Sequence, residues 1–201
     1  MSSPGDATGA PTPPFELLAD ASHRLATAGV VHALGASGLL HAHGLAAHVG
    51  DWDVTVEGER AAIEPLVADL APRFVGSSGV HADSKLVLHD GQVELILNFA
   101  LVTAGGVARM PTIVAGEWRG IPLGALEVWA AAYMLLERSA KADLVFARLQ
   151  ATGADPAALA RLLAEPLPAA LATRLSRLSA QRPDGGTAPS DSVDDRRTPR
   201  P

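Results

Sequence analysis

The chain of 201 residues is 48% hydrophobic and carries a formal net charge of −6, so it can bury one sizeable core and is acidic overall. This charge argues against a broad nucleic-acid-binding surface, which needs lysine and arginine gathered on one face. The absence of cysteine excludes disulfides, thiolate metal ligands and cysteine nucleophiles.

Both ends of the sequence have the composition of unstructured segments. Residues 1–14 and 181–201 are rich in proline, glycine, serine and aspartate, and we predict that both are disordered tails. Between them we predict an α+β core over 15–120 and a helical region over 121–180 packed on it. No stretch reaches the roughly 18 apolar residues of a membrane span, and no signal-peptide pattern is present. We therefore expect a soluble, cytoplasmic protein that does not bind membranes.

Segments with helical and strand periodicity alternate in the first half of the chain. Pro65 should confine the start of the last of these helices to a residue or two upstream, because proline lacks the N–H that a helix interior needs. The predicted elements, in order, are a helix over 15–28, a strand over 30–34, a short helix ending at Gly44, a strand over 51–58 and a helix over 63–70.

The second half begins with strands and ends with helices. Two strands are predicted over 84–90 and 93–101, and the Asp90-Gly91 pair between them is a strong hairpin signal. Short strands should flank the turn at 116–120. This order predicts an α+β fold in which a mixed β-sheet is followed by a C-terminal helical region. The four predicted helices cover 126–136, 142–150, 157–165 and 171–178.

Two of the predicted strands contain acidic side chains. Residues two apart on a strand share a face, so Asp51 and Asp53 should point to one side while Trp52 and its apolar neighbours bury the other. Glu94 is the only charged residue in an otherwise apolar strand, and a buried carboxylate needs a partner or a metal. Carboxylate oxygens are the ligands that Mg²⁺ prefers, so the three acids are candidate metal ligands.

A glycine-bearing turn precedes the first acidic pair. Gly35, Ser37 and Gly38 lie where a predicted strand passes into a short helix, so backbone N–H groups there can approach phosphate oxygens closely. Ser37 can also donate its hydroxyl. Neither the turn nor the acidic pair is specific alone, but their order along the chain is far more so.

Together these motifs resemble the signature of the DNA-polymerase-beta-like nucleotidyltransferase superfamily. The matching segments are Gly35-Ala36-Ser37, then Asp51-Trp52-Asp53-Val54 and later Val93-Glu94-Leu95. Residues 121–149 are also similar to a region of small bacterial nucleotidyltransferases, including the abortive-infection toxin type. The sequence departs from these patterns at Ala36, where glycine or serine is usual, and at Tyr133, where the toxin type has lysine.

The resemblance implies a mixed sheet that carries the acids and a helical region that closes over a nucleotide. It implies that Asp51, Asp53 and Glu94 are catalytic and hold Mg²⁺ or Mn²⁺, with Glu94 placed to take the acceptor's proton. The Gly35-Ala36-Ser37 turn would contact the phosphates of a nucleoside triphosphate. The implied reaction transfers a nucleotidyl group to a hydroxyl acceptor, and the acidic composition favours a small molecule or a protein over RNA.

Two lysines are the remaining candidates for nucleotide binding. Lys141 belongs to an altered Lys-Ala-Asp stretch in the toxin-like region, and Lys85 lies in the predicted strand over 84–90. Either could instead be a solvated surface lysine, and this alternative is favoured for Lys85.

Two other functions remain open. The altered turn and the missing lysine are compatible with a nucleotidyltransferase fold that has lost catalysis and serves as a binding or regulatory partner, as in a toxin–antitoxin pair. The second is a plain metal-binding domain that uses the histidines. His41, His43 and His48 lack the i, i+4 spacing of helical zinc ligands, so we predict that they are solvated or locally hydrogen-bonded, while His81 could reach the acids.

Overall fold

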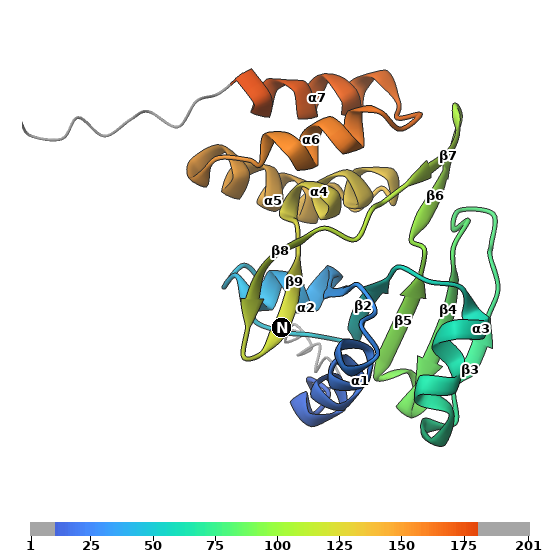
Figure 1. Ribbon diagram of the computed structural model, residues 1–201. Helices are drawn as coiled ribbons and strands as arrows, with labels where there is room; N and C mark the ends of the chain where they lie inside the picture. Colours follow the sequence, from blue (N-terminus) through green and yellow to red (C-terminus); the bar gives the residue numbers. More distant parts are fainter. Residues whose placement is uncertain (1–10, 181–201) are drawn as a thin grey trace, which may run out of the picture.

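The computed structural model describes residues 11–180, and within them a seven-stranded mixed sheet forms the centre of the molecule. Figure 1 shows the helices of the C-terminal region gathered above the sheet, with helices from the first half of the chain beside its strands at the lower end. The predicted α+β class, with helices in the C-terminal region, is confirmed. Residues 1–10 and 181–201 of the predicted tails lie outside the described part. Residues 11–14 lie inside it, and Trp52 Nε1 donates a hydrogen bond to the Pro14 carbonyl at 3.2 Å.

The sheet has the strand order β3-β4-β5-β2-β1-β9-β8. The β2–β5 and β1–β9 pairs are parallel, and the other pairs are antiparallel. The sheet therefore brings segments that are distant in sequence side by side. Its strands are β1 (His32–Leu34), β2 (Trp52–Val56), β3 (Arg73–Val75), β4 (Ser84–Leu88), β5 (Val93–Leu97), β8 (Val114–Trp118) and β9 (Ile121–Gly124).

The helices follow the apolar periodicity of the sequence. In α4 every residue from Leu126 to Tyr133 is buried, because this helix lies between the sheet and the other helices. The remaining helices bury one face each. The helices are α1 (Phe15–Thr27), α2 (Ala36–Ala42), α3 (Arg60–Ile63), α4 (Leu126–Leu135), α5 (Ser139–Thr152), α6 (Pro156–Leu163) and α7 (Ala169–Ala180), with the 3-10 helices η1 (Glu64–Leu70) and η2 (His89–Gly91).

The strand predicted over 93–101 is broken, which corrects the sequence-based expectation. Asn98 adopts a left-handed conformation with φ 52°, and its side-chain oxygen accepts a hydrogen bond from the Gly58 N–H at 3.1 Å. The chain then leaves the main sheet and forms a separate two-stranded sheet from β6 (Ala100–Thr103) and β7 (Gly106–Arg109). Asparagine tolerates this conformation better than the β-branched and aliphatic residues around it.

The helix predicted over 63–70 also differs in the structure. It begins at Arg60, earlier than expected, and it changes from an α-helix to a 3-10 helix at Glu64. Pro65 has no N–H to continue the α-helical hydrogen bonds, but the first turn of the 3-10 segment needs none there. The hairpin predicted at Asp90-Gly91 is confirmed, since β4 and β5 pair in antiparallel register around η2.

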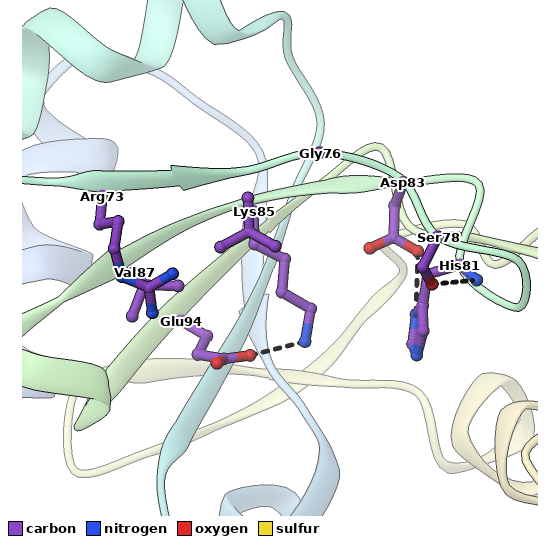
Figure 2. A pocket seen from close by; sticks show the side chains of 9 residues that line it. Arg73, Gly76, Ser78, His81, Asp83, Lys85, Val87 and Glu94 are labelled. Atoms are coloured by element: carbon purple, nitrogen blue, oxygen red, sulfur yellow. Dashed lines mark hydrogen bonds and ion pairs between the residues drawn. The ribbon is translucent and has the colours of Figure 1, made fainter.

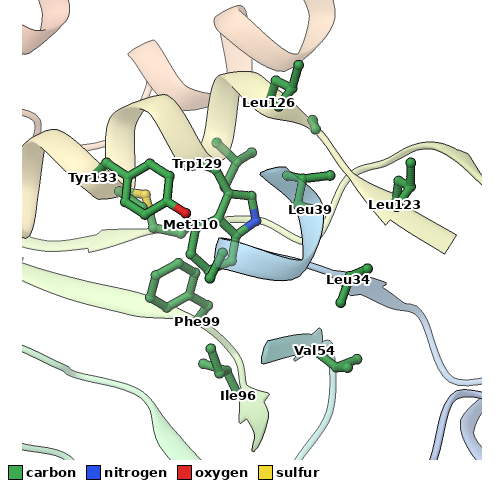
Figure 3. Packing of buried hydrophobic residues seen from close by; sticks show 14 of the residues in the cluster. Leu34, Leu39, Val54, Ile96, Phe99, Met110, Leu123, Leu126, Trp129 and Tyr133 are labelled. Carbon is green, nitrogen blue, oxygen red and sulfur yellow. The ribbon is translucent and has the colours of Figure 1, made fainter. Parts of the chain in front are cut away.

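One continuous core joins the sheet to the helices (Figure 3). The rings of Phe99 and Trp129 stack with their centroids 5.3 Å apart, and Tyr133 lies 5.8 Å from Trp129. These contacts fix α4 over the sheet. The predicted boundary at 120/121 falls just before β9, which belongs to the sheet, and the helices begin at Leu126. In the described part, no helix has the length and apolarity to cross a bilayer.

Candidate active site

The three predicted acids meet at one end of the central strands. Asp53 and Glu94 are direct cross-strand partners in the parallel β2–β5 pair, and Asp51 immediately precedes β2. Each of the three offers one carboxylate oxygen, and these oxygens all lie within 4.8 Å of one another. Parallel pairing thus brings Glu94 beside Asp53, although forty-one positions separate them in the sequence.

Burial and the crowding of negative charge both raise the pKa values of the aspartates. Burial, together with the charges of Asp51 and Glu94, raises the pKa of Asp53 from 3.8 to about 7, although Lys85 opposes the rise. Burial and then the charge of Glu94 raise the pKa of Asp51. Like charges at this separation disfavour ionisation unless a cation joins them. The acids therefore favour binding of a cation.

Lys85 supplies one such cation, which corrects the expectation that it is a solvated surface residue. Its Nζ donates to Glu94 Oε2 at 2.6 Å, and only 23% of its side chain is exposed. Burial alone lowers the pKa of Lys85, but the hydrogen bond and charge of Glu94 outweigh this effect and raise it. Glu94 thus has the partner that its place in an apolar strand required.

The donor set is suited to a hard divalent cation. In residues 11–180 these three acids form the only group of three or more carboxylate, histidine or cysteine ligands close enough to share a metal ion. All three offer oxygen, which Mg²⁺ and Mn²⁺ prefer to the nitrogen and sulfur ligands typical of zinc. Burial and the neighbouring carboxylates raise the pKa values of Asp51 and Asp53, and a divalent ion bound there would favour their ionised forms.

The glycine-bearing turn lies beside the acids at the start of α2. Ala36 is the first helical residue, with φ 41°, and it lines the same cavity as Asp51 and Asp53. The Gly35 N–H donates to the Asp53 carbonyl at 2.8 Å, so it is already used in holding the turn against β2. The Ser37 hydroxyl donates to the Asp51 carbonyl at 3.4 Å. Ala36 is therefore the member of the turn that reaches the cavity.

The glycine at 35 also has a packing role. A Cβ at this position would lie 2.0 Å from Cζ2 of Trp129, far inside contact distance. The indole of α4 thus occupies the space that any other residue at position 35 would need. This close approach links the turn to the helical layer above it.

The cavity over the acids has a volume of about 170 Å³. This is smaller than most ligand pockets, so a substrate bound at the acids must extend into adjoining space. A second cavity of about 330 Å³ adjoins it, and the two share His81, Lys85 and Glu94 (Figure 2). The residues around the smaller cavity are Ala36, Asp51, Asp53, His81, Lys85, Glu94, Phe99, Trp129, Leu136 and Arg138.

Several of these residues were not predicted as part of the site. Arg138 follows α4, and its charge lowers the pKa values of both aspartates. Arg138 lies in the toxin-like region at 121–149, three positions before Lys141, but it was not named as a candidate. Phe99 and Trp129 carried no signal of a site, because aromatic residues at these positions are equally expected in a core. Lys141 does not line the cavity; its Nζ lies 5.6 Å from the centre of the Tyr133 ring.

The histidines of the opening half do not form a metal site. His41 Nδ1 is 3.1 Å from the carbonyl of Ala46, which confirms a local hydrogen bond. None of His41, His43 and His48 belongs to the ligand group found in the described residues. His81 does reach the acid cavity, and its Nδ1 is 3.3 Å from Asp83 Oδ1.

Neither a protein-family model nor a curated protein matches the sequence. Three solved chains match the structure. One is a protein from Thermotoga maritima assigned as a nucleotidyltransferase, with a TM-score of 0.50 and 23% identity over 67% of this chain and 91% of the other. The chain has a nucleotidyltransferase fold.

The other two matches are structures of the antibiotic-resistance factor ANT(2'')-Ia. The structure in complex with adenylyl-2''-tobramycin has a TM-score of 0.52 and 13% identity, and it covers 82% of this chain and 96% of the other. The solution structure of the same factor has a TM-score of 0.50 and 15% identity over 82% of this chain and 94% of the other. The structural match to this factor therefore covers most of the present chain and nearly all of the factor.

Proposed function

We propose that the protein is a metal-dependent nucleotidyltransferase that moves a nucleoside monophosphate group from a nucleoside triphosphate to a hydroxyl acceptor. The observation that carries the proposal is the meeting of Asp51, Asp53 and Glu94 within 4.8 Å in a nucleotidyltransferase fold. The resemblance of the turn and acid motifs supports the same reaction.

The three acids would hold Mg²⁺ or Mn²⁺. Bound there, divalent ions would polarise the α-phosphate and neutralise the pyrophosphate that leaves. The acceptor oxygen forms a bond to the α-phosphorus as the bond to the oxygen bridging to the β-phosphate breaks. That oxygen leaves with pyrophosphate and keeps the electron pair, while the acceptor proton passes to the Glu94 carboxylate.

Residues around the acids are suited to the nucleotide. Ala36 lies at the start of α2, where the first N–H groups of a helix have no intrahelical acceptor and can bind phosphate oxygens. Arg138 contributes a positive charge at the same cavity. Lys85 lies on the opposite side, bonded to Glu94, and can neutralise phosphate charge there. Lys141 does not line the cavity, but its charge lowers the pKa of Asp51, so it lies close enough to the acids to attract phosphate.

The proposal is tested by incubating the protein with each of the four α-labelled nucleoside triphosphates, Mg²⁺ or Mn²⁺, and a cell extract. We expect label to move to an acceptor, and the size class of the labelled product identifies what kind of acceptor it is. Asp53→Ala should abolish transfer and retain the fold, while Asp69→Ala, an exposed aspartate away from the acids, should remain active. Equal activity of Asp53→Ala and the wild type would refute the assignment.

A second function is favoured by one observation. Tyr133, which replaces the lysine of the toxin-type pattern, is fully buried and lies in the core instead of lining the acid cavity. A fold that binds a regulatory partner without catalysis would need no lysine there. This function predicts no transfer from any labelled nucleotide together with a stable complex with a partner protein.

A further inference from the structure

We propose that the 330 Å³ cavity beside Glu94 is the acceptor site, and that it takes a small hydroxyl compound bearing a phosphate or carboxylate group, which Arg73 binds. This inference rests on the proposed function for the role of the compound as acceptor. It goes further by naming the chemical class of that acceptor and the residue that selects it.

The position of the cavity follows from the strand order. The turn at Ala36 lies on the β1 side of Asp53, so a triphosphate held by the turn occupies that side of the acids. Glu94 lies on the other side, and the second cavity extends from it over β4 and β3. A hydroxyl in this cavity can therefore reach Glu94 from the side opposite the turn.

Arg73 stands in line with the acids across the sheet. Arg73 pairs with Val87, Val87 pairs with Glu94, and Glu94 pairs with Asp53. Side chains in one such row share a face of the sheet. Strands are about 4.8 Å apart, so the Arg73 backbone lies about 10 Å from that of Glu94. Figure 2 shows the Arg73, Lys85 and Glu94 side chains extending on the same side of the strands.

The charges in the cavity favour an anion. Arg73 is exposed and has no ion-pair partner among residues 11–180, although it lines the cavity. The carboxylates of Asp83 and Glu94 also line this cavity, and Figure 2 shows Val87 and Glu94 next to Arg73, with Ser78 beside Asp83. A guanidinium in this position is suited to bidentate bonds to phosphate or carboxylate.

The carboxylates of the cavity are not arranged for a polycation. Asp83 has a side chain only 1% exposed, and it accepts bonds from His81 Nδ1 at 3.3 Å and from the Ala100 N–H at 3.4 Å. Glu94 is bonded to Lys85. Asp83 Oδ2 has no hydrogen-bond partner in the described part, but it is buried away from the cavity surface, so a ligand entering past Arg73 meets positive charge first.

The spacing also limits the size of the acceptor. An arginine side chain covers about half of the roughly 10 Å that separate the two backbones, so the hydroxyl and the anionic group should lie a few bonds apart. Glycerol 3-phosphate and gluconate both meet this requirement, and they differ in the anionic group. Tobramycin is a polycation of the opposite charge and serves as the contrasting probe.

Calorimetric titration of the full chain with these three compounds tests the site, with Arg73→Glu and Arg109→Glu as matched variants. Arg109 is also an exposed strand arginine, but it lines a different cavity. We expect the wild type and Arg109→Glu to bind glycerol 3-phosphate or gluconate, and Arg73→Glu to bind them about tenfold or more weakly. Binding of Mg²⁺-ATP should be equal in all three proteins, because Arg73 lies beyond the nucleotide.

Three outcomes of the titrations with the candidate acceptors would each overturn the inference. These are tobramycin binding without anion binding, the absence of binding to either anion, and equal affinities in the wild type and Arg73→Glu. Weaker Mg²⁺-ATP binding in Arg73→Glu would also overturn it, because Arg73 would then serve the nucleotide. Anion binding that depends on Arg73 without any label transfer from ATP would support the site and contradict the proposed reaction. Label transfer at an unchanged rate in Arg73→Glu would support the proposed reaction and contradict the assignment of the acceptor site.

Discussion

Replacing Asp53 with asparagine should remove activity and stabilise the metal-free fold at the same time. The asparagine side chain has nearly the same shape as aspartate but lacks the charge, which burial and the charges of Asp51 and Glu94 disfavour. The pKa of Asp53 in the folded protein is about 7, against an ordinary value of 3.8. The folded state therefore binds a proton that the unfolded state has lost in the pH range between these values.

The sign of the effect follows from this proton uptake. Stability falls as the pH rises from about 4 to about 7, and the loss is complete above the pKa of the folded state. A pKa change of this size corresponds to at most about 4 kcal/mol. Asp53 is half-buried rather than fully enclosed, and Lys85 and the other acids share the change in charge. We therefore expect asparagine to stabilise the protein by about 1 to 2 kcal/mol at pH 8.

The assay is urea unfolding at pH 5 and pH 8 in the presence of a chelator, followed by the same measurement with Mn²⁺. Asp53→Asn should exceed the wild type in unfolding free energy at pH 8, and the difference should shrink at pH 5. Mn²⁺ should stabilise the wild type more than the variant. Asp69→Asn is the control, and it should lower the unfolding free energy at pH 8, because the hydrogen bond to Arg24 lowers the pKa of Asp69. A pH-independent difference for Asp53→Asn, or a lower stability of that variant than of the wild type at pH 8, would refute the reasoning.

Three further substitutions test particular contacts. Gly35→Ala should destabilise the fold by about 1 to 3 kcal/mol, because its Cβ would collide with the α4 indole. Gly50→Ala is the control, because a Cβ there meets no atom within 4 Å. Urea unfolding of the two variants compares their free energies of unfolding. Tyr133→Phe should leave stability equal or raise it by about 1 kcal/mol in the same assay, because the buried hydroxyl has no hydrogen-bond partner in the described part; a clear loss would indicate a missed partner. Lys85→Met should bind Mn²⁺ about fivefold more tightly by calorimetry, because the ammonium no longer competes for the carboxylate; weaker binding would contradict this competition.

The arrangement of the acids was accessible from sequence because it depends on short-range periodicity. A strand places Asp51 and Asp53 on one face regardless of the rest of the fold, and the isolated charge of Glu94 required a polar partner. That the two strands lie side by side in parallel was not contained in the periodicity. The resemblance implied that the acids lie in one mixed sheet, and the parallel pairing of β2 with β5 was seen only in the structure.

The parts that were missed depend on contacts between distant segments. Lys85 looks like a surface residue on its own strand, and only the antiparallel pairing of β4 with β5 turns it toward Glu94. The break at Asn98 depends on a hydrogen bond to Gly58, forty positions earlier. Apolar periodicity continues through this break, so no local pattern could locate it. Arg138 likewise reaches the acids only because α4 lies over the sheet.

The turn at Gly35 shows why a motif glycine need not act on the ligand directly. Its N–H is bonded to the Asp53 carbonyl, and the face that lacks a side chain is covered by Trp129. The glycine therefore ties three parts of the site together: the turn, the strand that carries Asp53, and the helix that closes over them. A larger residue there would collide with the Trp129 indole of α4. If phosphate binding depends on this turn, the dependence must act through Ala36 and the start of α2, which face the cavity.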